Sequence, residues 1–180
     1  MSDYHSRHAI PKGEPKNYTF EIGDHIVYPA HGVGRITGME TQAVAGMELE
    51  VYVIAFDQDK MTLRVPTNKA RAGGMRPLAI GTVMDDAMKT LRGRARIKRA
   101  MWSRRAQEYE AKINSGDLVS IAEVVRDLHR ASDQPEQSYS ERQLYESALD
   151  RMAREVAAIE NIARDQAVAK LSETLSKRAA

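Results

Sequence analysis

The sequence lacks cysteine and is poor in large aromatics, with a single tryptophan and two phenylalanines. The absence of cysteine excludes disulfides and thiolate zinc sites, and it fits a reducing compartment. No apolar run is long enough to span a bilayer, and the N-terminus does not have the pattern of a signal peptide. We therefore expect a cytoplasmic protein without membrane association, metal or cofactor.

Neither sign of charge predominates, since 27 Lys and Arg residues stand against 25 Asp and Glu. With 42% hydrophobic and 29% charged residues, the composition is that of a folded, somewhat polar protein. A chain of 180 residues is long enough for one large domain or two small ones. Because the overall charge is nearly balanced, the distribution of charge along the chain carries more information.

No pattern of residues indicates catalysis. His25 and His31 flank an expected strand, Asp57 and Asp59 fit a hairpin turn, and no glycine-rich phosphate loop precedes a helix. The polar, proline-broken stretch 1–17 contains two more histidines, but no further cluster of metal ligands is fixed near them, and such a stretch is typical of a flexible tail. We expect that the protein is not an enzyme.

Residues 18–75 have the pattern of a β domain. Apolar and β-branched residues alternate, and Pro, Gly and Asp mark the turns, so we predict strands over 24–30, 35–41, 47–56 and 61–65. The glycines in His31-Gly-Val-Gly-Arg35 fit the bend between the first two strands. So many short antiparallel strands in under sixty residues favour a small, strongly bent barrel.

Residues 76–176 have the pattern of a compact all-α domain, so the fold class is α+β with two domains. Helical periodicity predicts a helix over 78–91, one in the segment that contains Trp102 and ends at Asn114, and one over 118–128 that Asp117 caps. Ser138 and Glu141 form a capping-box pattern before a long helix, and a last helix has Ala167, Leu171 and Leu175 on one face.

The densest positive charge lies in residues 92–105, which contain no acidic residue. Trp102 lies in this segment, and a cationic stretch with an aromatic residue points to nucleic acid. The spacing of Trp102, Ala106 and Tyr109 fits a buried stripe, so the indole could belong to the core. Its place at the start of that stripe, among charged neighbours, weighs against burial. The residues alone leave both interpretations open.

Five motifs, in order and with compatible spacing across 18–159, resemble the CarD/CdnL family of bacterial transcription regulators. They are Phe20-Glu-Ile-Gly-Asp-His-Ile-Val-Tyr-Pro-Ala-His-Gly-Val-Gly, Leu63-Arg-Val-Pro66, Trp102-Ser-Arg-Arg105, Ser115-Gly-Asp117 and Ala122-Glu-Val-Val-Arg-Asp-Leu128. The resemblance implies a Tudor-like barrel that binds the β subunit of RNA polymerase. It also implies a helical domain that contacts promoter DNA at the upstream edge of the melted region and stabilises the open complex.

The resemblance further implies roles for individual residues. The tryptophan is expected to be an exposed wedge, and the nucleic-acid-binding set comprises Lys98, Arg99, Trp102, Arg104 and Arg105. The polymerase contact is expected at Arg64, with Leu63 and Val65 supplying the strand edge. For Arg92, Arg94 and Arg96, contact with DNA and a solvated connection remain equally open.

Two other functions fit the residues. A small barrel with a basic helical appendage is also typical of proteins that bind RNA or the ribosome. Alternatively, the helical half could be a protein-interaction module whose cationic face meets an acidic partner. We expect a monomer, although exchange of short strands between copies is a second possibility.

Overall fold

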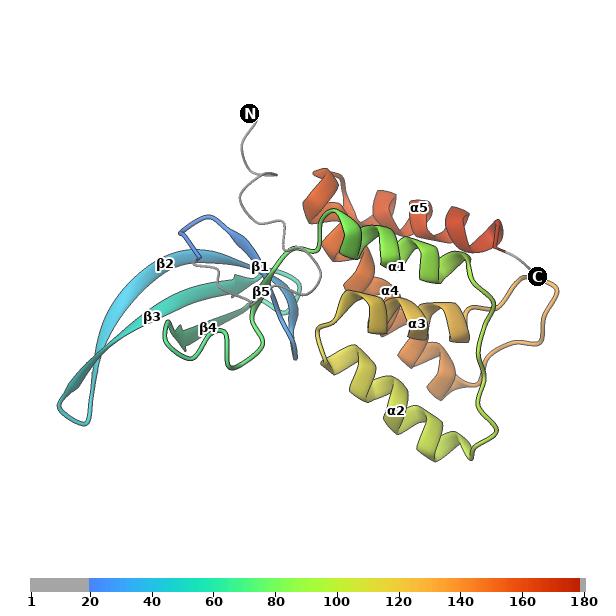
Figure 1. Cartoon of the computed structure of the whole chain (residues 1–180), viewed down its shortest axis with the longest axis horizontal. Helices are drawn as coiled ribbons and strands as arrows, with labels where there is room; N and C mark the ends of the chain where they lie inside the picture. The colour runs from blue at the N-terminus through green and yellow to red at the C-terminus, as the bar shows by residue number, and fades with distance from the viewer. Residues whose placement is uncertain (1–19, 179–180) are drawn as a thin grey trace. The chain divides into compact units, whose positions relative to one another are not determined.

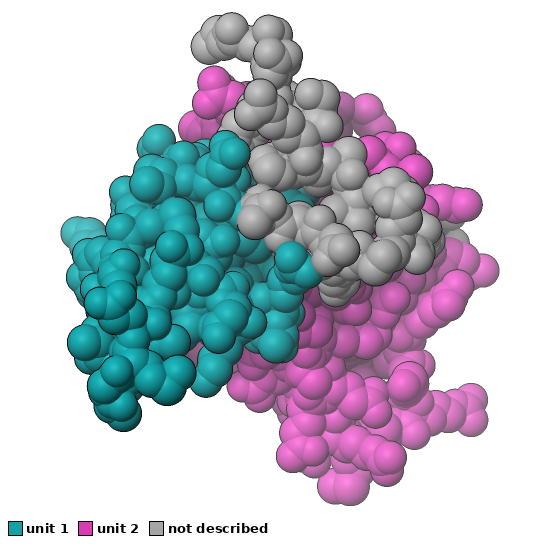
Figure 2. Space-filling model, turned by 60° about the vertical axis from the view of Figure 1, so that its left-hand side comes forward, with its two compact units in different colours: residues 1–78 teal, residues 79–180 magenta. Residues whose placement is uncertain are grey.

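A computed structural model describes residues 20–178 of the chain. The chain divides into two compact units, residues 1–78 and 79–180, which Figure 2 distinguishes by colour. The described part has a five-stranded antiparallel sheet followed by five helices (Figure 1), so the predicted α+β class is confirmed.

The strands are β1 (His25–Tyr28), β2 (Gly32–Val44), β3 (Met47–Phe56), β4 (Met61–Pro66) and β5 (Arg76–Pro77), in the sheet order β4-β3-β2-β1-β5. The expected closure into a barrel is wrong, because β4 and β5 are the two edges of the sheet and do not pair within residues 20–178. The edge strand β5 is only two residues long, and Pro77 has no amide hydrogen to donate to a further strand.

The prediction of a tight bend through Gly34 is also wrong, since β2 already begins at Gly32. Gly32 has φ +80°, which supports the turn. Gly34, in contrast, lies within the strand opposite Ile26. A Cβ at Gly34 would lie 2.7 Å from Cε1 of Phe56, so this glycine is needed for packing of the sheet core.

Beyond a bulge between Ile36 and Gly38, β2 and β3 continue to Val44 and Met47 as a long curved ribbon (Figure 1). The core of this unit is formed by side chains from β1–β4, from Phe20 and from the segment before β5. Its buried side chains are Phe20, Ile26, Ile36, Tyr52, Ile54, Phe56, Val65, Ala70 and Met75.

The helices are α1 (Thr82–Arg92), α2 (Trp102–Asn114), α3 (Leu118–Leu128), α4 (Tyr139–Glu160) and α5 (Arg164–Ser176). The first starts four residues later than the predicted 78. Ala79 N donates to the buried Glu155 Oε2 at 2.6 Å, and Gly81 then has φ +64°, so the backbone before Thr82 is not helical.

Two predicted helix starts are confirmed. The Asp117 carboxylate accepts from Ser120 N at 3.0 Å at the start of α3, and Ser138 Oγ accepts from Glu141 N at 3.2 Å at the start of α4. The carboxylate of Glu141 pairs with Arg130, at 3.2 Å. This ion pair ties the first turn of α4 to the residues that follow α3.

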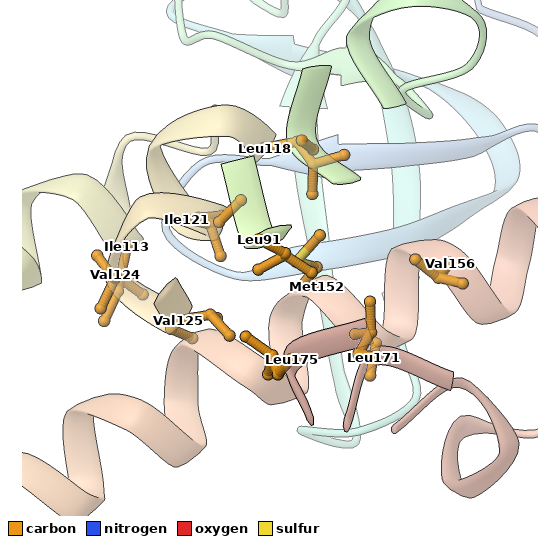
Figure 3. Close-up of a cluster of buried hydrophobic side chains, with 14 of the residues drawn as sticks. Leu91, Ile113, Leu118, Ile121, Val124, Val125, Met152, Val156, Leu171 and Leu175 are labelled. Carbon is orange, nitrogen blue, oxygen red and sulfur yellow. The ribbon is translucent and has the colours of Figure 1, made fainter. Parts of the chain in front are cut away.

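Helix α3 is the centre of the second unit and packs against α1, α2 and α4. Figure 3 shows side chains from all five helices meeting in one core, among them Leu91, Ile113, Val125, Met152 and Leu171. This core supports the helix that begins with Trp102.

Candidate nucleic-acid and partner interfaces

Most of the cationic segment lies in the exposed connection between α1 and α2. Every residue from Arg94 to Met101 is exposed. Asp127, which is buried on α3, accepts from Arg96 N at 2.9 Å and from Arg126 Nε at 2.8 Å. The Asp127 carboxylate therefore fixes the path of the connection, and the side chains beyond Arg96 remain in solvent.

Two arginines of the predicted set are exposed and free. The side chains of Arg99 and Arg104 make no hydrogen bond or ion pair with any residue in 20–178. Lys98 pairs with Glu108 at 3.4 Å while 74% of its side chain is exposed, and such a surface pair contributes little to stability. These three cations are therefore available to phosphate groups.

The N-terminus of α2 adds to the positive potential. Its first turn contains Arg104 and no acidic residue, and the N-cap residue Met101 provides no side-chain hydrogen bond. The amide groups at a helix N-terminus carry partial positive charge. They are repelled by cationic side chains beside them and attract anions. An anionic partner would therefore stabilise this turn.

Trp102 is half-buried, at the edge of the helical core. Its Nε1 donates to Ser140 Oγ at 2.9 Å, and its ring centroid is 6.3 Å from that of Tyr109. The sequence left open whether the indole is buried in the core or exposed, and each interpretation is partly right. It packs on the core, and it still presents surface to solvent.

Arg105 differs from the other cations of the predicted set. Its guanidinium carbon lies 5.4 Å from the ring centroid of Trp102 and 5.9 Å from that of Tyr109. No described residue accepts a hydrogen bond from its buried Nε. Arg105 is therefore engaged with two aromatic rings, in the distance range of a cation–π contact.

The predicted polymerase contact lies on β4, which forms one edge of the sheet. The Arg64 side chain is exposed, whereas Val65 is buried and Leu63 packs partly against the core. Of these three residues, Arg64 can offer a side chain to a partner, and the other two can offer their backbone. Arg64 Nε also pairs with Glu40 Oε2 at 3.0 Å.

Sequence reasoning missed the supporting roles of Ser140 and Asp127. Asp127 lies in one of the family-like motifs, so the motif contained a signal without indicating the role. Ser140 is 38 residues from Trp102 and has no signal in the sequence. Within residues 20–178, no group of three or more His, Asp or Glu side chains is arranged to hold a metal ion. No helix of the described part has the length and apolar character needed to cross a membrane.

Comparisons with known proteins cover both units. Residues 20–79 match the CarD-like/TRCF RID domain, and residues 86–172 match the CarD C-terminal domain. Together the two domains define an RNA polymerase-interacting transcription factor. The chain belongs to the CarD/CdnL family of bacterial transcription regulators.

One similar relative is a Bacillus subtilis (strain 168) protein described as "Putative transcription factor YdeB". It is 30% identical over 147 residues, which are 82% of this chain and 96% of the relative. Among solved structures, the solution NMR structure of the 72-residue N-terminal domain of Myxococcus xanthus CarD is 27% identical. It covers 41% of this chain and 91% of that domain, with a TM-score of 0.30.

Proposed function

We propose that the protein binds the β subunit of RNA polymerase through its sheet domain, residues 18–75, and stabilises the promoter open complex through its helical domain, residues 76–176. The observation that carries the proposal is the arrangement at the start of α2. A half-exposed indole lies there beside the free cations of Arg99 and Arg104.

The aromatic ring is the part of this surface that suits melted DNA. An apolar side chain inserted from the minor-groove side fills the gap that opens where adjacent base pairs unstack. At the upstream edge of the melted region, the Trp102 ring favours the open complex over the reannealed duplex, because only the open complex offers that gap.

The cations supply affinity without sequence preference. Lys98, Arg99 and Arg104 neutralise backbone phosphates and release counterions, which makes binding dependent on salt. Arg105 holds the aromatic rings and adds its charge to the same surface. A surface of so few cations gives weak binding by the isolated protein, so attachment to polymerase brings it to the promoter.

The free edge of β4 fits the polymerase contact. The outer edge of an edge strand carries backbone donors and acceptors with no partner in the sheet, and a strand of another protein can pair with it. Arg64 adds a charged side chain on an exposed face of this strand. We further propose that the protein acts as a cytoplasmic monomer, held at the nucleoid through polymerase.

Partner capture tests the proposal against its main alternative. The tagged full-length chain should co-purify with RNA polymerase from lysate and bind the purified β subunit. Basic surfaces do not distinguish DNA from RNA, so ribosome binding is the competing outcome. Sedimentation with ribosomes and no retention of polymerase would contradict the proposed function.

A further inference from the structure

We infer that Ser140 is a positioning residue that holds the indole of Trp102 in one orientation for its contact with DNA. This inference rests on the proposed function, because it concerns how Trp102 presents its ring to DNA. It assigns a role in promoter opening to a residue of α4, outside the cationic segment.

The hydrogen bond joins the first turns of two helices. Trp102 is the first residue of α2, Ser140 is the second of α4, and the Nε1–Oγ distance is 2.9 Å. This distance is typical of a well-formed N–H···O bond. Rotation of the indole about either side-chain torsion would break it.

Ser140 itself is held in place by its neighbours. Ser138 caps α4 through Glu141 N at 3.2 Å, and the Glu141 carboxylate pairs with Arg130 at 3.2 Å. Ser140 lies between these two fixed residues. The backbone that carries its hydroxyl is therefore held in place by contacts within the first turn of α4 and to the residue Arg130 after α3.

Two further contacts restrict the ring. The Arg105 guanidinium lies over the indole at 5.4 Å, and Tyr109 packs beside it at 6.3 Å with a ring angle of 46°. The indole thus has a contact on one face, a neighbour at its side and a hydrogen bond at its N–H edge. An aromatic group that is already ordered loses less conformational entropy when it enters DNA than a free one does.

The same hydrogen bond occupies the one polar group of the indole. Tryptophan has one donor, Nε1–H, and no acceptor. In the free protein Ser140 accepts from this donor. The surface that the ring presents in this orientation is therefore apolar.

Substitutions at Ser140 test the inference in the full-length protein. Ser140→Ala removes the acceptor, Ser140→Thr keeps it, and Ser147→Ala is a matched control at another exposed serine of α4. Ser140 is exposed, so the fold should survive, and circular dichroism with thermal unfolding verifies this. Trp102 is the sole tryptophan, so its fluorescence anisotropy decay reports the mobility of this ring alone.

The first readout needs no DNA. Ser140→Ala should increase the fast, local component of the Trp102 anisotropy decay and speed solvent exchange of the indole N–H. Ser140→Thr and Ser147→Ala should leave both unchanged. Equal ring mobility and N–H exchange in wild type and Ser140→Ala would overturn the positioning role.

The second readout is the lifetime of the promoter open complex. Ser140→Ala should shorten it by about two- to tenfold, the factor expected for loss of one hydrogen bond. In a Trp102→Phe background, Ser140→Ala should have no further effect, because Phe has no N–H to donate. Additive effects of the two substitutions would overturn the inference.

The two readouts separate this inference from the proposed function. If Trp102→Ala shortens the lifetime and Ser140→Ala leaves it unchanged, the wedge holds and its positioning by Ser140 is wrong. If Ser140→Ala loosens the ring but Trp102→Ala leaves the lifetime unchanged, positioning of the ring is supported and the wedge function fails. In that case the stacking role at DNA fails with it.

Discussion

Arg64 on β4 and Glu40 on β2 form an ion pair of 3.0 Å that reaches across β3, with 48% and 47% of the two side chains exposed. Surface pairs of this kind contribute roughly 0–1 kcal/mol, so a carboxylate on a partner can displace Glu40 at little cost. Until that occurs, Glu40 holds the guanidinium in place over the sheet.

The first prediction concerns this pair. Arg64→Glu should abolish binding to the β subunit, because it replaces the proposed cationic contact with a second carboxylate beside Glu40. Glu40→Gln should retain or strengthen binding, since it frees the guanidinium. A pull-down with the purified β subunit checks both, with Lys69→Glu as a charge-reversal control at another exposed position of the same unit. Full binding by Arg64→Glu would place the contact elsewhere.

Arg99 and Arg104 should behave as phosphate contacts. Alanine at either position should weaken binding to every promoter sequence alike and lower the slope of log K against log salt by about 1. The measurement is a salt titration of the complex with polymerase and promoter DNA. Arg142→Ala, an exposed arginine on α4, is the control. An unchanged slope in both variants would exclude these two residues from the interface.

Arg105 should differ from them, because its guanidinium lies over two aromatic rings. Arg105→Ala should loosen the Trp102 ring as seen in its fluorescence. It should also change the salt slope less than Arg104→Ala does. If Arg105→Ala lowers the slope of log K against log salt by about 1 and leaves the mobility of the Trp102 ring unchanged, Arg105 is only a phosphate contact.

Gly34 should be essential to the sheet domain. A Cβ there would lie 2.7 Å from Phe56 and 2.9 Å from Ile54, so Gly34→Ala should destabilise this unit by about 1–3 kcal/mol through overpacking. Gly38→Ala on the same strand is the control, since nothing lies within 4 Å of its Cβ. Chemical denaturation and hydrogen exchange of the β1 amides measure the difference. Equal stability of the two variants would contradict the prediction.

Stability should fall in mild acid. Burial, together with the nearby Arg178 charge, lowers the pKa of His129 below its ordinary value of 6.5. The unfolded chain then binds a proton more readily than the folded one. The stabilising contribution of neutral His129 is therefore complete above pH 6.5 and is lost as the pH falls through 6.5 toward the lower folded pKa.

Denaturation at several pH values, with wild type and His129→Gln, checks this expectation. The free energy of unfolding of the second unit should depend less on pH in the variant. Burial also lowers the pKa of His25 in the first unit, so the two units should lose stability in the same direction. A pH dependence that is identical in wild type and His129→Gln would contradict the assignment.

Sequence patterns predicted those elements that depend on local residues. The strand over 47–56 was found from its alternation, and the helices that end at Asn114 and Leu128 from their periodicity and, for the second, from the capping Asp117 before it. The start of α1 was missed because Ala79 bonds to Glu155, which is 76 residues away. Gly34 was assigned to a turn because its steric conflict with Phe56 depends on the folded sheet.

In the candidate site, too, local sequence patterns predicted what depends on neighbouring residues and missed what depends on distant ones. Alternation along β4 correctly placed Arg64 outward and Val65 inward. The cationic segment and its tryptophan were visible at once, but how far the indole is exposed depends on the position of α4. No local pattern could show that Ser140 would reach Trp102.

The lifetime of the promoter open complex, measured after a competitor challenge, tests the central claim most directly. With polymerase and one promoter, Trp102→Ala should shorten this lifetime by about 5- to 150-fold, the factor for losing a base–aromatic contact worth roughly 1–3 kcal/mol. Trp102→Phe should retain part of the effect, because it keeps an aromatic ring. A lifetime equal to that of the wild type, in a Trp102→Ala protein that folds and binds polymerase, would contradict the account.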